Sequence, residues 1–190
     1  MRVKRHMKKT SFISPLSVWL LCLFIQPVVS FAQDKANPTL KSILLDQFKS
    51  TYNVEDWFVP ATKAIEGMTP EQAIWKACDS CHSVAQEATH LIFWDKEQLA
   101  KFRGEKPDPF DGDNSKTFVN MDKAQWTAIV NQLNQVLGYI EKTIEQADET
   151  KLKQMYSAIA HISTHNAYHT GQILFIRKMQ GSWNPQNGVK

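Results

Sequence analysis

The chain has 190 residues, of which 43% are hydrophobic and 22% charged, and it contains no internal repeat and no low-complexity tract. Five of its 22 basic residues and none of its 19 acidic residues fall within residues 1–32, so the remaining 158 residues have a formal net charge of −2. That charge, and the lack of a basic stripe with interleaved aromatic residues, argues against a nucleic-acid partner. The length suits one domain with a sizeable core.

Residues 1–32 have the three parts of an export signal. Basic residues at positions 2–9 precede an apolar run from Phe12 to Val29, and Ser30 and Ala32 are small residues placed for cleavage. We expect residues 1–32 to be a signal peptide, residues 33–190 to be the mature domain, and the protein to be exported, periplasmic or secreted. The alternative is an uncleaved membrane anchor, but two prolines interrupt the apolar run. We expect the protein to contact a membrane only through this segment.

Apolar residues at three-four spacing predict four helices, and almost no alternating strand pattern is found. The expected fold is therefore an all-α four-helix bundle. Ser83 and Asp122 are expected to start the second and third helices with capping boxes, because Gln86 and Gln125 follow three residues later. The predicted helices cover about 39–52 with a restart after Pro60, 83–104, 122–144 and about 150–179, with a short helical turn at 71–75.

The connections between these helices predict their order. Helices three and four are joined by a few polar residues around Asp148, so they should be antiparallel neighbours. The polar segment 105–121 is long enough to carry the chain back along a 20-residue helix, so helices two and three can run parallel. We expect an up-down-down-up bundle in which this long crossover lies across one end and can cover a site.

His165 and His169 are the most informative pair in the chain. They lie four residues apart in the fourth predicted helix, so both can bind the same divalent ion from one face. Apolar residues share that face, so both side chains should point towards the core. His161, one turn earlier, is an alternative ligand or, more commonly for such a residue, an exposed histidine.

A second motif is Cys78-Asp79-Ser80-Cys81-His82, which has the spacing of a c-type haem attachment site. In an exported chain the same cysteines can instead form a disulfide or redox pair, or remain as free or metal-binding thiols. Cys22 lies in the signal segment, so one pair remains in the mature chain. The disulfide or redox pair is the favoured interpretation, with haem c as the alternative.

Three segments of the chain together resemble the DinB/YfiT-like family of four-helix-bundle proteins, many of which are described as metalloenzymes. They are residues 67–73 (GMTPEQA) with Trp75, residues 82–86 (HSVAQ) with 90–94 (HLIFW), and residues 165–173 (HNAYHTGQI). The third segment is fairly specific, and the three follow the family's order over nearly the whole mature chain. The resemblance also accounts for His82 without haem.

The resemblance implies a metal site made of His90, His165 and His169, with zinc or nickel as the ion. Three histidines that leave a position for water are typical of a catalytic metal. His90 lies at the edge of the apolar stripe of its predicted helix, which suits a ligand in a cleft better than a buried residue. Glu87, Asn166, Tyr168 and Gln172 can orient ligands or substrate but are not assigned a catalytic role.

The expected function is that of an exported, metal-dependent enzyme of the hydrolase or thiol-transferase type, acting on a small-molecule substrate. Metal-assisted hydrolysis is favoured, because family members of the thiol type use cosubstrates kept mainly in the cytosol. Two alternatives stay open: a redox or haem protein that uses Cys78 and Cys81, and a metal-binding bundle without catalysis. The substrate and the oligomeric state, including a homodimer, are left open.

Overall fold

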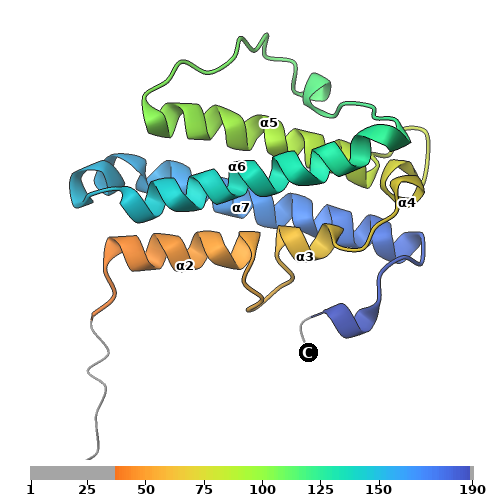
Figure 1. Ribbon diagram of the computed structural model, residues 1–190, viewed down its shortest axis with the longest axis horizontal. Coiled ribbons are helices and arrows are strands. Elements are labelled where there is room, and N and C mark those ends of the chain that lie inside the picture. The colour runs from red at the N-terminus through yellow and green to blue at the C-terminus, as the bar shows by residue number, and fades with distance from the viewer. Residues whose placement is uncertain (1–36, 189–190) are drawn as a thin grey trace, which may run out of the picture. The chain divides into compact units, whose positions relative to one another are not determined.

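The computed structural model describes residues 37–188, and every regular element in that range is a helix. The predicted signal segment lies outside the described residues. The helices are α2 (Leu40–Tyr52), α3 (Ala61–Ile65), α4 (Pro70–Ile74), α5 (Val84–Arg103), α6 (Trp126–Gln146) and α7 (Glu149–Met179), with 3₁₀ turns η1 (Asn114–Thr117), η2 (Lys123–Gln125) and η3 (Pro185–Asn187). The prediction of an all-α four-helix bundle is confirmed, with α2, α5, α6 and α7 as its four long helices (Figure 1).

Capping residues set the starts of these helices. Ser83 accepts the backbone N–H of Gln86, whose side chain returns to the Ser83 N–H, so the predicted capping box of α5 is present. Asp122 and Gln125 form the same arrangement, but they open the 3₁₀ turn η2, and α6 follows at Trp126. α5 ends at Gly104, which has a φ of 74° and so adopts the left-handed conformation that stops a helix.

Contacts between α5 and α6 show that these neighbours run in the same direction. Lys96 Nζ bonds Gln132 Oε1, and the Arg103 guanidinium lies over the Tyr139 ring, so both contacts join residues 36 positions apart. α2 runs opposite to α6, because Lys41 bonds the Glu145 carbonyl near one end and Tyr52 the Asn134 carbonyl near the other. The order is therefore up-down-down-up, as predicted (Figure 1).

The crossover, residues 104–121, carries the chain back along a helix, as its length predicted, but its predicted place across one end is wrong. It runs back along α5 instead of lying across one end of the bundle (Figure 1). Its second half bonds α5 directly: Gln86 Nε2 donates to the Phe118 carbonyl, and Thr89 Oγ1 accepts the Val119 N–H. These buried polar groups of α5 need partners, and the backbone of the crossover supplies them.

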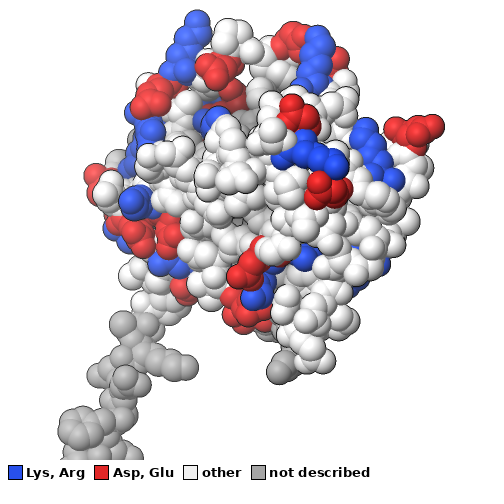
Figure 2. Space-filling view, turned by 45° about the vertical axis from the view of Figure 1, so that its right-hand side comes forward, with Lys and Arg blue, Asp and Glu red and all other residues white. Residues whose placement is uncertain are grey.

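The core lies between the four long helices and contains fully buried residues from each of them, including Phe48, Leu91, Leu133 and Ile159. On the face shown in Figure 2, basic and acidic side chains are intermixed with uncharged surface. None of the described helices combines the length and the apolar character that crossing a membrane requires.

Candidate metal centre

His90 of α5 and His165 and His169 of α7 lie together at the interface of these two helices. One ligand nitrogen from each can be chosen so that all lie within 4.8 Å of one another. His90 Nε2 and His165 Nε2 are 3.1 Å apart. Two nitrogens bound at about 2.0–2.1 Å to one tetrahedral ion lie roughly 3.3 Å apart, so this spacing fits a shared metal.

Thr117 of the crossover determines which nitrogen of His90 carries the proton. The Thr117 hydroxyl donates its only hydrogen to the Asn114 carbonyl, at 2.7 Å. Its oxygen, 2.5 Å from His90 Nδ1, must therefore accept the Nδ1 proton. His90 Nε2 is then left with a free lone pair that faces His165.

Glu87 has the same effect on His169. Glu87 Oε2 lies 2.7 Å from His169 Nδ1, and both side chains are buried. A carboxylate can only accept a hydrogen bond, so Nδ1 of His169 carries the proton and Nε2 keeps a lone pair. Histidines that bind metals usually donate their other N–H to a carboxylate or another oxygen acceptor in this way.

His82 contacts residues that hold His90 and His169 in place. Its Nδ1 lies 3.3 Å from Glu87 Oε1. Its ring also stacks on Phe118 at 3.8 Å, and the other face of Phe118 stacks on His90 at 4.0 Å. A stack of three rings therefore fixes the plane of His90, and His82 contributes to the setting of two histidines without joining their cluster.

Burial keeps His90 and His165 uncharged at neutral pH. Burial, followed by the charges of His169, His165 and His82, lowers the pKa of His90 to about 3. Burial, followed by the charge of His169, lowers the pKa of His165 to about 4. Both imidazoles are then neutral near pH 7, which is the form that binds a metal ion.

His90 lines a groove, as expected of a ligand in a cleft, but the expectation that it is not a buried residue is wrong. Only 2% of its surface is exposed. The sequence pattern of α5 places it at the edge of the stripe, but Thr117 and Phe118 of the crossover cover that edge. His169 is buried as expected, and His165 is half-buried. His161 is exposed and lies outside the cluster.

Cys78 and Cys81 form a disulfide in the loop before α5. Cys78 is exposed and Cys81 is half-buried. Both sulfurs are thereby bonded to each other, whereas haem attachment would require each of them in a thioether bond. His82 follows this loop directly and faces Glu87 and Phe118, as described above.

Asp95 is a buried carboxyl group that the sequence analysis did not single out. It is fully buried, and its Oδ1 accepts a hydrogen bond from Asn166 Nδ2 at 3.3 Å. Asp95 Oδ2 and Asn166 Oδ1 are buried without a partner among the described residues. Burial raises the pKa of Asp95 to about 8, and a proton on Oδ2 would give both oxygens a way to pair.

Sequence reasoning also missed Thr117 and Phe118. They lie in an irregular segment without periodicity, 27 and 28 positions after His90, so no spacing rule links them to the site. Glu87 carried a usable signal, since it lies one turn before His90 on the same helix, but a single helical glutamate is usually solvated.

A groove of about 1,410 Å³ opens beside the three histidines, between α5, α7 and the crossover. Trp94 and Phe118 contribute to one wall, and Tyr168 and His161 contribute from α7. Any ion held by the histidines can therefore be reached by a small molecule. Fixed histidine tautomers, low histidine pKa values and an open groove together make a site that can bind a metal and present it to a ligand.

A comparison with protein-family models matches residues 61–173 to the family described as the DinB superfamily. The matched segment runs from α3 into the second half of α7, so it contains all three histidines and the disulfide. Comparisons with curated proteins and with solved structures gave no match.

Proposed function

The chain belongs to the DinB superfamily, and from this premise we propose that it is an exported enzyme that binds one divalent metal ion and hydrolyses a small-molecule substrate. His90, His165 and His169 would hold the ion through their Nε2 atoms. Zinc and nickel are the proposed ions, since both accept imidazole ligands.

The observation that supports this proposal most is the fixed protonation of the ligands. Thr117 and Glu87 accept the Nδ1 protons of His90 and His169, so the Nε2 lone pairs of both rings are free for a metal. His90 Nε2 and His165 Nε2 lie 3.1 Å apart, a separation that suits two nitrogens bound to one ion and also a hydrogen bond from a protonated His165 Nε2 to His90 Nε2. The two arrangements differ in the tautomer of His165, and the proposal takes the one in which its Nε2 binds the ion.

A bound ion would supply Lewis acidity, which lowers the pKa of a water molecule and polarises a carbonyl group. The chain's own residues hold the ligands in place, keep His90 and His165 neutral and leave one side open to the groove. Three protein ligands fit a catalytic site, because structural zinc sites usually have four. Glu87 is committed to His169 and His82, so no general base is assigned.

The Cys78–Cys81 disulfide supports the second candidate, a redox function of the loop before α5. The same disulfide argues against covalent haem, because it occupies the two sulfurs that haem attachment would need. A thiol-transferase reaction at the metal remains the alternative chemistry, and a bundle that binds metal without turnover is the non-enzymatic one. Metal-assisted hydrolysis is preferred because export would remove the protein from cytosolic thiols.

The test is the metal content of protein purified from its exported compartment, measured by elemental analysis beside single alanine variants. We expect one ion per chain in the wild type, and almost none in His165→Ala or His169→Ala, with a strong loss in His90→Ala. His161→Ala is the matched control, because it removes an exposed histidine of the same helix and should keep the ion. Circular dichroism checks that the variants remain folded.

Catalysis is tested by removing the ion with a chelator and assaying ester and amide substrates before and after zinc or nickel is restored. Hydrolysis that is lost with the ion and returns with it supports the enzyme. Wild-type metal content in both α7 variants would place the site elsewhere. Stoichiometric metal without turnover would favour the non-catalytic bundle.

A further inference from the structure

The groove beside the histidines is uncharged along its length. Each residue that lines it, among those the structure describes, is aromatic, aliphatic, histidine, or a neutral amide or hydroxyl residue. Away from the histidine cluster, where a bound ion would add positive charge, the groove therefore offers hydrogen bonds and aromatic surface but no charged side chain to pair with a charged ligand.

The helix that forms one side of the groove has the same character. α7 carries no Asp, Glu, Lys or Arg from Gln154 to Ile176, although Tyr168 is 63% exposed and the segment includes other exposed residues. Exposed helix faces in soluble domains normally carry charged residues. The uncharged face of α7 is therefore unusual for surface that meets only water.

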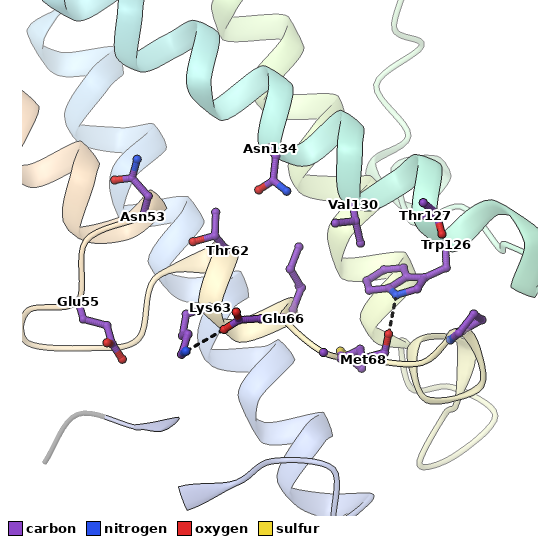
Figure 3. Close-up of a pocket in the computed structure, with 13 residues that line it drawn as sticks. Asn53, Glu55, Thr62, Lys63, Glu66, Met68, Trp126, Thr127, Val130 and Asn134 are labelled. Carbon is purple, nitrogen blue, oxygen red and sulfur yellow. Dashed lines mark hydrogen bonds and ion pairs between the residues drawn. The ribbon is translucent and has the colours of Figure 1, made fainter. Parts of the chain in front are cut away.

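A second hollow shows that charge is available elsewhere in this protein. It has about 660 Å³ and lies between α3 and α6, where Glu55, Lys63 and Glu66 line it (Figure 3). Lys63 and Glu66 form an ion pair of 2.7 Å there, and Trp126 donates its indole N–H to the Met68 carbonyl. The two hollows differ in charge, and only the uncharged one reaches the histidine cluster.

The groove is also long. Its lining on α7 extends from His169 at the metal end to Gln154, which are 15 positions apart and so about 22 Å along a helix. Gln98 of α5 and Ser157 of α7 lie towards the far end and can each donate and accept hydrogen bonds. Trp94 lines the groove between His90 and Gln98 on α5, and its N–H donates a hydrogen bond to Asn114 Oδ1.

We infer that the groove binds an uncharged, extended molecule that carries amide or hydroxyl groups and an aromatic ring, with one end at the histidine cluster. A charged group placed in the groove away from the histidine cluster would lose hydration without gaining an ion pair, which weakens its binding. A neutral amide or hydroxyl exchanges hydrogen bonds with water for hydrogen bonds with Gln98, Ser157 and Gln154. The inference rests on the proposed function in one respect: the bound molecule is a substrate only where an ion is present.

The experiment uses three matched capped hexapeptides as probes, because an extended hexapeptide spans about 20 Å. The first contains serine, glutamine and phenylalanine, and the other two replace glutamine by glutamate or by lysine. Binding to the full mature protein is followed by the ¹⁵N indole signals of Trp94 and Trp126. We expect the neutral probe to shift the Trp94 signal, to leave Trp126 unchanged, and to bind at least about tenfold tighter than either charged probe.

A charge introduced into the groove should reverse this preference. In Ser157→Lys, the glutamate probe should gain about tenfold relative to the neutral probe, because the new ammonium supplies its partner. Tyr156→Lys is the matched control: Tyr156 is exposed on the same helix but does not line the groove, so the order of the probes should not change.

The result that would overturn the inference is a charged probe that binds wild-type protein as tightly as the neutral one, or no Trp94 shift with any probe. Elemental analysis of the same sample separates this from failure of the proposed function. If the sample contains metal but shows no preference for the neutral probe, only the inference about the groove fails. A neutral preference in protein that holds no metal removes the proposed enzyme and leaves the groove as a binding site for uncharged ligands.

Discussion

At the scale of single residues, Thr117 shows how one hydroxyl group can determine the chemistry of a site. It is 97% buried in the crossover, accepts the Nδ1 proton of His90 and gives its own proton to the Asn114 carbonyl. Loss of such an outer partner typically lowers metal affinity about 10–100-fold. A substitution of Thr117 therefore tests whether His90 is held in place as a metal ligand or only lies near the other two histidines.

Replacing Thr117 by valine should lower zinc affinity by about tenfold or more, because valine has a similar shape but cannot accept the His90 proton. Thr117→Ser is the control, since it keeps the hydroxyl and should stay within about threefold of wild type. Competition with a chelating dye measures both. Equal affinity for valine and wild type would show that Thr117 does not position His90.

Asp95 gives a prediction about pH. Burial raises its pKa to about 8 in the folded protein, against 3.8 for an ordinary aspartate. Between about pH 4 and 8 the unfolded chain has therefore lost this proton while the folded chain keeps it. The folded state binds more protons, so the contribution of Asp95 to the free energy of unfolding is full below pH 4 and falls as the pH rises.

Asp95→Asn should remove this loss, because an amide does not titrate and its NH₂ group can donate to the unpartnered Asn166 Oδ1. The stability of the variant relative to wild type should increase from pH 4 to pH 8, by more than about 1.4 kcal/mol, the energy of one pKa unit. Urea unfolding at several pH values measures it. A difference that does not change with pH would show that Asp95 is ionised in the folded state.

The sequence predicts some of these residues and not others, for physical reasons. His165 and His169 follow from helical spacing alone, and the structure brings them together at one face of α7. His90 is 75 positions from His165, so only the family resemblance linked it to them. Thr117 and Phe118 depend on how an irregular segment folds over α5, which no local pattern encodes.

At the scale of elements, Thr89 is one of the residues that attach the crossover to α5. Its Oγ1 accepts the Val119 N–H at 3.0 Å and lies 3.2 Å from the Thr117 carbonyl. Thr89→Val should release the segment around Thr117, at a cost of about 1 kcal/mol for the lost hydrogen bond. Limited proteolysis should then cut the crossover faster than in wild type, and zinc affinity should fall.

Thr143→Val is the control for this change, because the Thr143 hydroxyl bonds only the Tyr139 carbonyl within α6. Its cleavage rate and zinc affinity should match those of wild type. A Thr89 variant with unchanged cleavage would mean that other contacts hold the crossover.

The elements themselves were well predicted where their signals were local. Capping boxes and apolar spacing marked the long helices, and the short turn at Asp148 made α6 and α7 antiparallel. The return of the crossover along a helix was predicted from its length, but its position across one end was wrong, because its polar residues do not indicate which surface they cover. Buried polar groups on α5 decide that path, and their need for partners appears only once the helix is packed.

At the scale of the whole molecule, the Cys78–Cys81 disulfide leads to a prediction about the mature protein. Produced in a host with haem-attachment machinery and exported, it should contain no covalent haem and should have the mass of residues 33–190 with one disulfide. Intact mass and a pyridine haemochrome spectrum test this together. A c-type spectrum with a mass increased by one haem would contradict it, and an uncleaved chain would contradict the signal peptide alone.

The parallel arrangement of α5 and α6 has a consequence for the order in which the protein folds. α6 and α7 are joined by a tight turn and can pair early, whereas contacts between α5 and α7, such as the one between His90 and His165, require closure of a far longer loop. The histidine cluster would then be completed after the main barrier has been crossed. An ion bound there would slow the unfolding rate and leave the folding rate almost unchanged, so the native state would gain lifetime and would not form faster.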